Sequence, residues 1–348
     1  MGLPVKLFGA KGSGIVLTVF GKTDVGRTRD HNEDCFLVAN LTEKHASLQP
    51  DVREHEIGAR GSLMIVADGM GGAAAGEVAS QLATETIYQH LVDNWLEDKK
   101  NTPQQFAYRL KEAVEQANAR IHVYAKEHPE MRGMGTTTTA VGVLEDHLYI
   151  TQVGDSRAYL VRGSDGIQLT KDQSLMQRLV DAGEITEAEA EKSERRNIIL
   201  QALGPDAKVR VDLTNQQIRK GDTVVLCSDG LSGQVTKEEI AERVSQPGSD
   251  LVGVCSELID LANERGGPDN ITVVVARFSG NGLKDPDGED EVGHSVYPLL
   301  DPESTTEPVP VYKGSDPPTP QDKVQMIIAG VVAAGITALS LAFAVIGL

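Results

Sequence analysis

The chain has 348 residues, of which 40% are hydrophobic and 24% are charged, and its formal net charge is -18. This length and composition are typical of a globular protein with one large domain or two ordinary ones. The negative charge argues against nucleic acid as a partner, because phosphate backbones attract an excess of Lys and Arg. The three cysteines, Cys35, Cys227 and Cys255, form no CxxC pair, so a disulfide framework is not expected. The eight histidines have no HxH, HExxH or HxxxH spacing, so a zinc site is disfavoured.

After an N-terminal tail at 1–14, residues 15–280 are predicted to form one domain. Two long helical patterns, 76–97 and 103–128, follow one another between strands, and the later strands follow one another as hairpins. This order favours an α+β fold of antiparallel sheets covered by helices over a doubly wound parallel sheet. Strands are predicted at 16–25, 62–67, 138–144, 148–153, 157–162, 208–213, 223–228 and 271–278, and shorter helices at 173–182, 236–245 and 249–265.

The composition changes after residue 280. Residues 281–323 are rich in proline and acidic residues and have no periodic apolar pattern, so a disordered linker is predicted. Residues 324–348 carry no charged side chain and exceed the roughly 20 residues that span a bilayer. A transmembrane helix is the prediction there, and a buried core helix is the alternative.

Acidic residues recur where apolar runs begin or end. Asp68, Asp155 and Asp229 each follow a predicted strand, and Asp269 and the pair Glu33-Asp34 each precede an apolar run. One Asp next to Gly is most simply a turn, but several acids at one sheet end repel one another unless a cation neutralises them. Oxygen ligands without His or Cys favour Mg²⁺ or Mn²⁺.

Two such cations held together have an obvious use. They activate a bridging water and bind an oxyanion, typically phosphate. Arg29 lies four residues before Glu33 and is a candidate phosphate ligand, with an ordinary surface arginine as the alternative.

Six segments together resemble the metal-dependent protein phosphatases, the type 2C Ser/Thr phosphatases or PPM family, in the style of the bacterial members. The resemblance covers roughly residues 15–278 and implies an αββα four-layer sandwich, with two antiparallel sheets flanked by helices and metals between the sheets at one end. The matching segments are Thr23–Gly26 with Arg29–Asp34, Val66–Gly72, Gly135–Thr137, Val153–Arg157, Leu226–Leu231 and Gly267–Thr272.

The resemblance also implies ligands for two Mn²⁺ or Mg²⁺ ions. Asp68, Asp229 and Asp269 are expected to hold one ion. Glu33, Asp68 and the carbonyl of Gly69 are expected to hold the second.

Further roles follow from the same motifs. Asp34 is expected to orient the attacking water, and Arg29 to bind the substrate phosphate. Asp155, together with Asp229, resembles the third-metal site of bacterial members.

Two positions depart from the family pattern. Met70 stands where many eukaryotic members have a His that is a candidate general acid, so no general acid is assigned. Gln173 replaces the His of the usual Asp-His-Ser segment. The following stretch, 176–200, resembles the flap beside the family's active site.

The predicted function is hydrolysis of phosphoserine and phosphothreonine in proteins by a metal-activated bridging water, in opposition to a Ser/Thr kinase. The catalytic domain is expected to be monomeric and to face the cytoplasm on a single-pass C-terminal anchor, with a membrane Ser/Thr kinase or its targets as partners.

A catalytically inactive scaffold domain is disfavoured because every expected ligand position is filled. A phosphoesterase for small molecules remains the other alternative, which turnover of phosphopeptides against nucleotides or sugar phosphates distinguishes.

Overall fold

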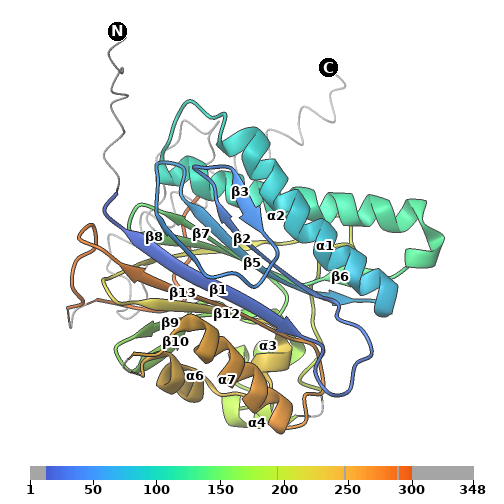
Figure 1. Ribbon diagram of the computed structural model, residues 1–348. Helices are drawn as coiled ribbons and strands as arrows, with labels where there is room; N and C mark the ends of the chain where they lie inside the picture. Colours follow the sequence, from blue (N-terminus) through green and yellow to red (C-terminus); the bar gives the residue numbers. More distant parts are fainter. Residues whose placement is uncertain (1–12, 194, 247, 288–289, 300–348) are drawn as a thin grey trace, which may run out of the picture. The chain divides into compact units, whose positions relative to one another are not determined.

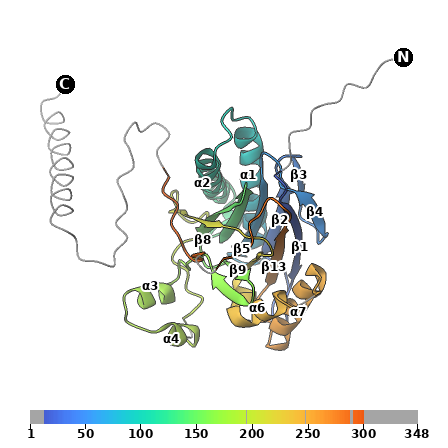
Figure 2. The same ribbon diagram turned by 90° about the vertical axis from the view of Figure 1, so that its left-hand side faces the viewer.

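The computed structural model describes residues 13–299, apart from residues 194, 247, 288 and 289 (Figure 1). Two antiparallel sheets lie face to face, and helices cover both outer faces (Figure 2). The predicted four-layer sandwich is therefore confirmed, and the order of the strands explains where the acidic residues meet.

One sheet has six strands and the other has seven. The first sheet runs in the order β10 (Asp165–Gln168), β9 (Arg157–Arg162), β12 (Thr223–Cys227), β13 (Ile271–Ser279), β1 (Val16–Asp24) and β4 (Arg53–Glu56). The second sheet runs in the order β11 (Asp212–Gln217), β8 (His147–Val153), β7 (Thr138–Leu144), β5 (Ser62–Met70), β2 (Asp34–Asn40) and β3 (His45–Ser47), with β6 (Gly135–Thr136) paired to the end of β5.

Helices α1 (Ala73–His90) and α2 (Pro103–Glu127) cover the second sheet, and α6 (Lys237–Val244) and α7 (Leu251–Glu264) cover the first (Figure 1). Helix α2 begins as predicted, with the Thr102 side chain accepting a hydrogen bond from the Gln105 amide at 3.3 Å. The remaining helical elements are α3 (Leu175–Asp181), α4 (Glu187–Glu191), α5 (Asp229–Ser232), a π-helical turn at Leu91–Trp95 and a 3₁₀ turn at Pro129–Met131.

Apolar side chains alternate between the two faces of the strands and fill three apolar layers. In β2, Leu37 and Ala39 face α1 and α2, whereas Phe36 and Val38 face the other sheet. This period of two is the expected pattern for a strand that is buried on both faces. Asp34 lies two residues before Phe36, so the same alternation directs its side chain into the space between the two sheets.

Antiparallel pairing brings the functional segments to one end of the sandwich. In the second sheet, β2 begins where β5 ends, and β7 begins where β8 ends. In the first sheet, β13 begins where β1 and β12 end. All the predicted acidic positions therefore lie at the same end of the two sheets.

The region that was predicted to be a linker is partly ordered. Residues 290–297, which we call the strap, run along the edge strand β11: the Asn215 amide donates to the Ser295 carbonyl, and the Tyr297 amide donates to the Leu213 carbonyl, both at 3.0 Å. Tyr297 also packs edge-on against Tyr149. The prediction of a disordered linker from 281 is thus wrong for 281–287 and 290–299, because backbone pairing, apolar packing and ion pairs hold this acidic segment against the domain.

Other differences concern weakly patterned strands. Strand β11 begins four residues later than predicted, and β2, β3, β4, β6 and β10 were not among the predicted strands. None of the helices within residues 13–299 is long and apolar enough to cross a membrane. The predicted transmembrane helix at 324–348 lies outside the described residues, as do residues 1–12 of the tail and 300–323 of the linker.

Candidate metal-dependent active site

Strand ends and short turns hold each predicted site residue. Arg29 and Glu33 lie in the loop between β1 and β2, and Asp155 lies in the turn after β8. The others sit at strand termini: Asp34 opens β2, Asp68 and Gly69 lie near the end of β5, Asp229 begins α5 directly after β12, and Asp269 precedes β13. The structure therefore brings the predicted residues to one end of the sandwich, while their roles stay predictions.

Asp34 is buried between the sheets and held by the opposite sheet. Its Oδ2 accepts hydrogen bonds from the Ser228 and Thr272 hydroxyls, both at 2.7 Å. Its Oδ1 is also buried but has no hydrogen-bond partner. Burial raises the pKa of Asp34 to about 7. The hydrogen bonds from Thr272 and Ser228 lower this pKa, whereas the negative charges of Asp229 and Asp269 raise it further.

The neighbouring carboxylates show the same tendency. Burial raises the pKa of Asp68 well above its usual range, and repulsion from Asp34 and Asp229 adds to the effect. Burial also raises the pKa of Asp229, whose buried Oδ1 has no partner, and raises that of Asp155 to about 8. These acids resist ionisation unless something positive lies among them.

The loop with Glu33 approaches β5 very closely. The Gly69 amide donates to the Glu33 carbonyl at 3.1 Å, and a Cβ at Gly69 would overlap that carbonyl. A Cβ at Gly76, in the first turn of α1, would overlap the Glu33 carboxylate. Glycine at both positions therefore allows Glu33 to reach the end of β5.

Asn270 fastens the same loop from the other sheet. Its Oδ1 accepts from the Glu33 amide at 2.8 Å, and its Nδ2 donates to the carbonyls of Val25 and His31, both at 2.9 Å. Arg29 then forms an ion pair with Asp269, with 2.8 Å between Nη2 and Oδ2. The Arg29 side chain is still 48% exposed, so it is accessible to a substrate.

The residues present fit a site for hard cations. Every donor is an oxygen, and two buried carboxylate oxygens, on Asp34 and Asp229, have no partner. Within the described ranges, however, no three acidic, His or Cys side chains are spaced as a closed set of metal ligands. Asp269 is instead paired with Arg29 through Oδ2.

Sequence reasoning assigned no role to Ser228, Thr272 or Asn270. All three lie inside the motifs that carry Asp229 and Asp269, which was the available signal. Their partners, however, come from the other sheet or from the loop before β2, and only the packing of the two sheets reveals them.

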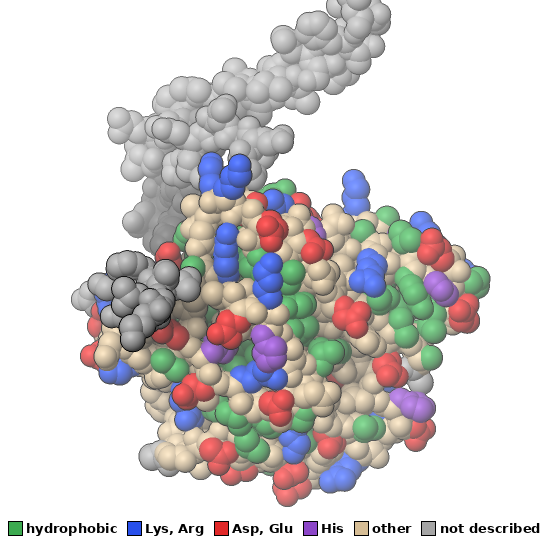
Figure 3. Space-filling model, turned by 45° about the horizontal axis from the view of Figure 1, so that its top comes forward, with side chains coloured by type: hydrophobic (Ala, Val, Ile, Leu, Met, Phe, Trp, Pro, Cys, Tyr) green, Lys and Arg blue, Asp and Glu red, His purple; other side chains and the backbone are tan. Residues whose placement is uncertain are grey.

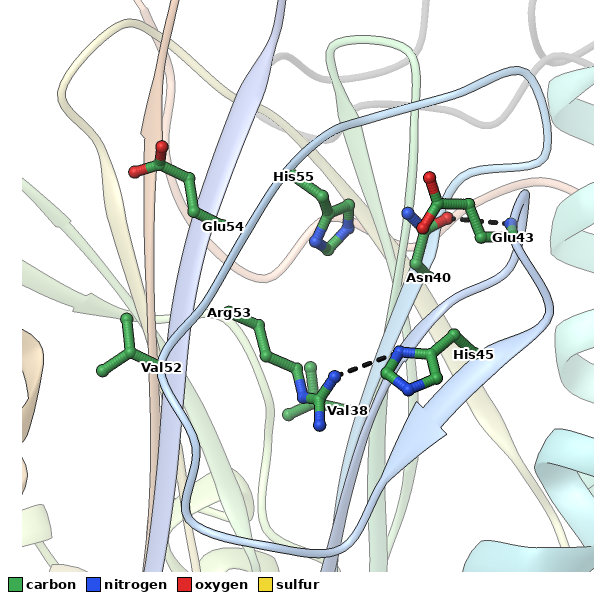
Figure 4. A pocket seen from close by; sticks show the side chains of 8 residues that line it. All are labelled: Val38, Asn40, Glu43, His45, Val52, Arg53, Glu54 and His55. Carbon is green, nitrogen blue, oxygen red and sulfur yellow. Dashed lines mark hydrogen bonds between the residues drawn. The ribbon is translucent and has the colours of Figure 1, made fainter.

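A separate pocket of about 290 Å³ lies at the opposite end of the sheets (Figure 4). The Arg53 guanidinium contacts His45 Nδ1 there at 3.0 Å. The pocket adjoins Asn40, six residues along β2 from Asp34, or roughly 20 Å at the usual rise of a strand. It therefore does not belong to the acidic site. It is lined by Val38, Asn40, Glu43, His45, Val52, Arg53, Glu54 and His55.

Charge is more evenly spread on the face seen in Figure 3 than at the strand ends. On the face seen in Figure 3, acidic and basic side chains are interspersed. The concentration of acids at the site is therefore a feature of the buried strand ends and not of that face.

The comparisons with known proteins agree with this fold and site. The family model "Protein phosphatase 2C" matches residues 45–265. The serine/threonine protein phosphatase PstP of Mycobacterium tuberculosis is 38% identical over 262 residues, which are 75% of this chain but only 45% of PstP. The serine/threonine phosphatase stp of Listeria innocua is 37% identical over 255 residues, or 73% of this chain and 93% of that protein.

Solved structures show the same likeness. The crystal structure of PstP matches with a TM-score of 0.62 and 38% identity, and covers 75% of this chain and 98% of that one. Stp1 from Staphylococcus aureus matches with a TM-score of 0.65 and 32% identity, over 75% and 95% of the two chains. Fold and sequence thus place the chain among the serine/threonine phosphatases. It belongs to the protein phosphatase 2C family, which confirms the predicted family and enzyme class.

Proposed function

We propose that the chain hydrolyses phosphoserine and phosphothreonine in proteins in a metal-dependent reaction. The observation that carries the proposal is the buried group of Asp34, Asp68 and Asp229, with raised pKa values and two carboxylate oxygens without partners. Burial of these carboxylates between the two sheets costs free energy unless divalent cations bind to them. The names of the relatives, serine/threonine phosphatases, support the substrate class.

Two Mn²⁺ or Mg²⁺ ions are the proposed cofactors. A structure of the PstP catalytic domain, 37% identical to this chain, is in complex with two manganese ions. Here Asp68, Asp229 and Asp269 would hold one ion, and Glu33, Asp68 and the Gly69 carbonyl the other. When bound, the ions supply Lewis-acid activation of water and neutralise charge on the phosphate.

The chain's own residues then position the reactants. Asp34 is fixed through Oδ2 by Ser228 and Thr272, which leaves Oδ1 to accept a hydrogen bond from the attacking water. Arg29 leaves Asp269 and binds the phosphate through its guanidinium. No phosphoenzyme is proposed, since no Cys or Ser stands in a nucleophile motif.

Asp155 is the proposed ligand of a third ion, together with Asp229. Its pKa is raised mainly by burial and then by the charge of Asp229, which is the expected electrostatic relationship for two carboxylates that share a cation.

The setting of the enzyme is also a proposal. We propose that residues 324–348 anchor the domain to the membrane with its active site in the cytoplasm, where it opposes a Ser/Thr kinase as a monomer. The support is the uncharged sequence of that segment and its length.

The test of the proposed activity is substrate choice. The full chain with Mn²⁺ should release phosphate from a phosphothreonine peptide much faster than from nucleotides or sugar phosphates, and Asp229→Ala should release none. Faster turnover of the small metabolites would instead identify a small-molecule phosphoesterase. No turnover of any substrate would favour a binding domain.

A further inference from the structure

Gln173 joins four segments next to the proposed site. It stands where the family resemblance leads one to expect His, and its side chain is buried with 7% of the residue exposed. The side-chain Oε1 accepts a hydrogen bond from the Gly154 amide at 3.0 Å, and the Gln173 amide donates back to the Gly154 carbonyl at 2.8 Å. Both polar groups of the residue that precedes Asp155 are thus bound by Gln173.

The other end of the same side chain reaches β11. Its Nε2 donates to Asp212 Oδ2 at 2.9 Å and lies 3.4 Å from the Arg210 carbonyl. Gln173 therefore connects the turn after β8 to the edge strand along which the strap runs. An apolar side chain of the same size makes neither bond.

The backbone of Gln173 closes the base of the flap, residues 176–200. The Leu200 amide donates to the Gln173 carbonyl at 2.7 Å, and the Leu175 amide donates to the Ile198 carbonyl at 2.8 Å. The two ends of the flap are thereby paired beside Asp155. A shift of Gln173 displaces the flap and the Asp155 turn together.

The turn itself has little freedom of its own. Gly154 has a φ of +98°, and a Cβ there would overlap Thr137, so this backbone conformation is available to glycine alone. The position of Asp155 follows that of the turn. From outside β8, Gln173 binds Gly154 in this turn, and Thr137 and Thr139 bind Ser156.

We propose that Gln173 is a positioning residue, which holds the Asp155 turn, the base of the flap and β11 in one arrangement and so sets the divalent-cation affinity of the Asp155 side of the site. This inference rests on the proposed metal-dependent function. It does not require Gln173 to touch a cation or a substrate. Residues that orient metal ligands typically change metal affinity about 10–100-fold when they are replaced.

Substitutions separate hydrogen bonding from packing. Gln173→Met keeps the volume but loses both bonds. Gln173→Glu keeps an acceptor for Gly154 but places a second carboxylate against Asp212. Gln173→His keeps one donor and one acceptor in the neutral ring. The control is Gln168→Met, because Gln168 donates to Asp172 at 3.2 Å and does not contact the Asp155 turn.

The experiment is calorimetric titration of the full chain with Mn²⁺, in which Asp155→Asn identifies the binding step that depends on Asp155. We expect Gln173→Met and Gln173→Glu to weaken that step at least about tenfold and to leave the tighter steps unchanged. Gln173→His should recover most of the affinity, and Gln168→Met should behave as the wild type. Hydrogen exchange at the Leu200 amide should accelerate in the two weakened variants.

Three outcomes would overturn the proposal. Unchanged Mn²⁺ affinity in Gln173→Met is one, and equal weakening of all steps together with a general loss of stability is another. A titration in which Asp155→Asn removes no step is the third. Because these readouts do not use turnover, an inactive wild-type chain would reject the proposed function without deciding this question.

Discussion

Asp34 lies directly opposite Asp68 in the antiparallel pairing of β2 with β5. In β2, Asp34 lies on the same face of the strand as Phe36 and Val38, which face the other sheet. In β5, Asp68 lies on the same face as Met64 and Val66, which also face the other sheet. Both carboxylates therefore point into the space between the sheets. Like charges in such a pair destabilise a sheet, so the fold itself creates a demand for protons or cations at this point.

The first prediction concerns the pH dependence of the metal-free protein. The folded-state pKa values of Asp34 and Asp155, about 7 and about 8, lie above the usual value, so the folded state binds more protons than the unfolded state between about pH 4 and pH 8. The free energy of unfolding should therefore fall as pH rises through this window. Thermal melts in chelator between pH 5 and pH 8 measure it.

Addition of Mn²⁺ should raise the melting temperature most at pH 8, where these carboxylates are ionised. Asp34→Asn should flatten the pH profile in chelator, because it removes one of the carboxylates with a raised pKa. A metal-free protein that becomes more stable from pH 5 to pH 8 would contradict this electrostatic description of the site.

The second prediction concerns Arg29. Arg29→Ala should mainly raise KM for phosphate esters, because its proposed partner is the substrate phosphate. Loss of the ion pair also frees Asp269, so Mn²⁺ affinity in calorimetry should be unchanged or higher. Arg27→Ala, in the same loop with an exposed side chain, is the matched control. A loss of bound metal in Arg29→Ala would show that the assigned role is wrong.

The third prediction concerns the strap. Asp290 forms ion pairs with Arg219, at 2.8 Å between Nε and Oδ2, and with Arg162, and both arginines are largely buried. Asp290→Ala should therefore lower the melting temperature, because it leaves buried guanidinium groups without this partner. Glu291→Ala, an exposed neighbour, should have no such effect. Equal melting temperatures for the two variants would mean that the ion pairs of Asp290 add nothing to the stability of the domain.

The sequence predicts most of the scaffold but not its polar edges. The strongly apolar strands β1, β5, β7 and β12 were expected because their patterns are long and regular. Strand β4 consists of Arg53, Glu54, His55 and Glu56, and such an edge strand has no apolar alternation to reveal it. The strap escaped prediction for a related reason, since its composition resembles that of disordered chain and its ordering depends on β11.

The candidate site, too, was predictable from the sequence only in part. Acidic residues at strand ends were visible because each stands beside a recognisable apolar run. The residues that hold them were not, because the bonds from Ser228, Thr272 and Asn270 cross between sheets or loops that are far apart in the sequence. Gln173 was noticed only as a departure from a motif, and its contacts with Gly154 and Asp212 required the folded chain.

The fourth prediction concerns the proposed anchor. A chain that ends at residue 323 should appear in the soluble fraction, whereas the full chain should stay with carbonate-washed membranes. Turnover of a soluble phosphopeptide should be nearly the same for both, because the proposed site residues all lie before Ile271. Turnover of a membrane-bound substrate should fall in the shorter chain, since the tether supplies effective concentration. Full-length protein that washes off the membranes would refute the anchor.

The central claim is that the buried carboxylates work by holding divalent cations. The most direct measurement is phosphate release from a phosphothreonine peptide by the full chain, before and after removal of metal with a chelator. Release should cease on chelation and return with Mn²⁺ or Mg²⁺ but not with Ca²⁺, whose looser coordination suits the site poorly, and Asp229→Ala should stay inactive throughout. Undiminished release in chelator would contradict the claim.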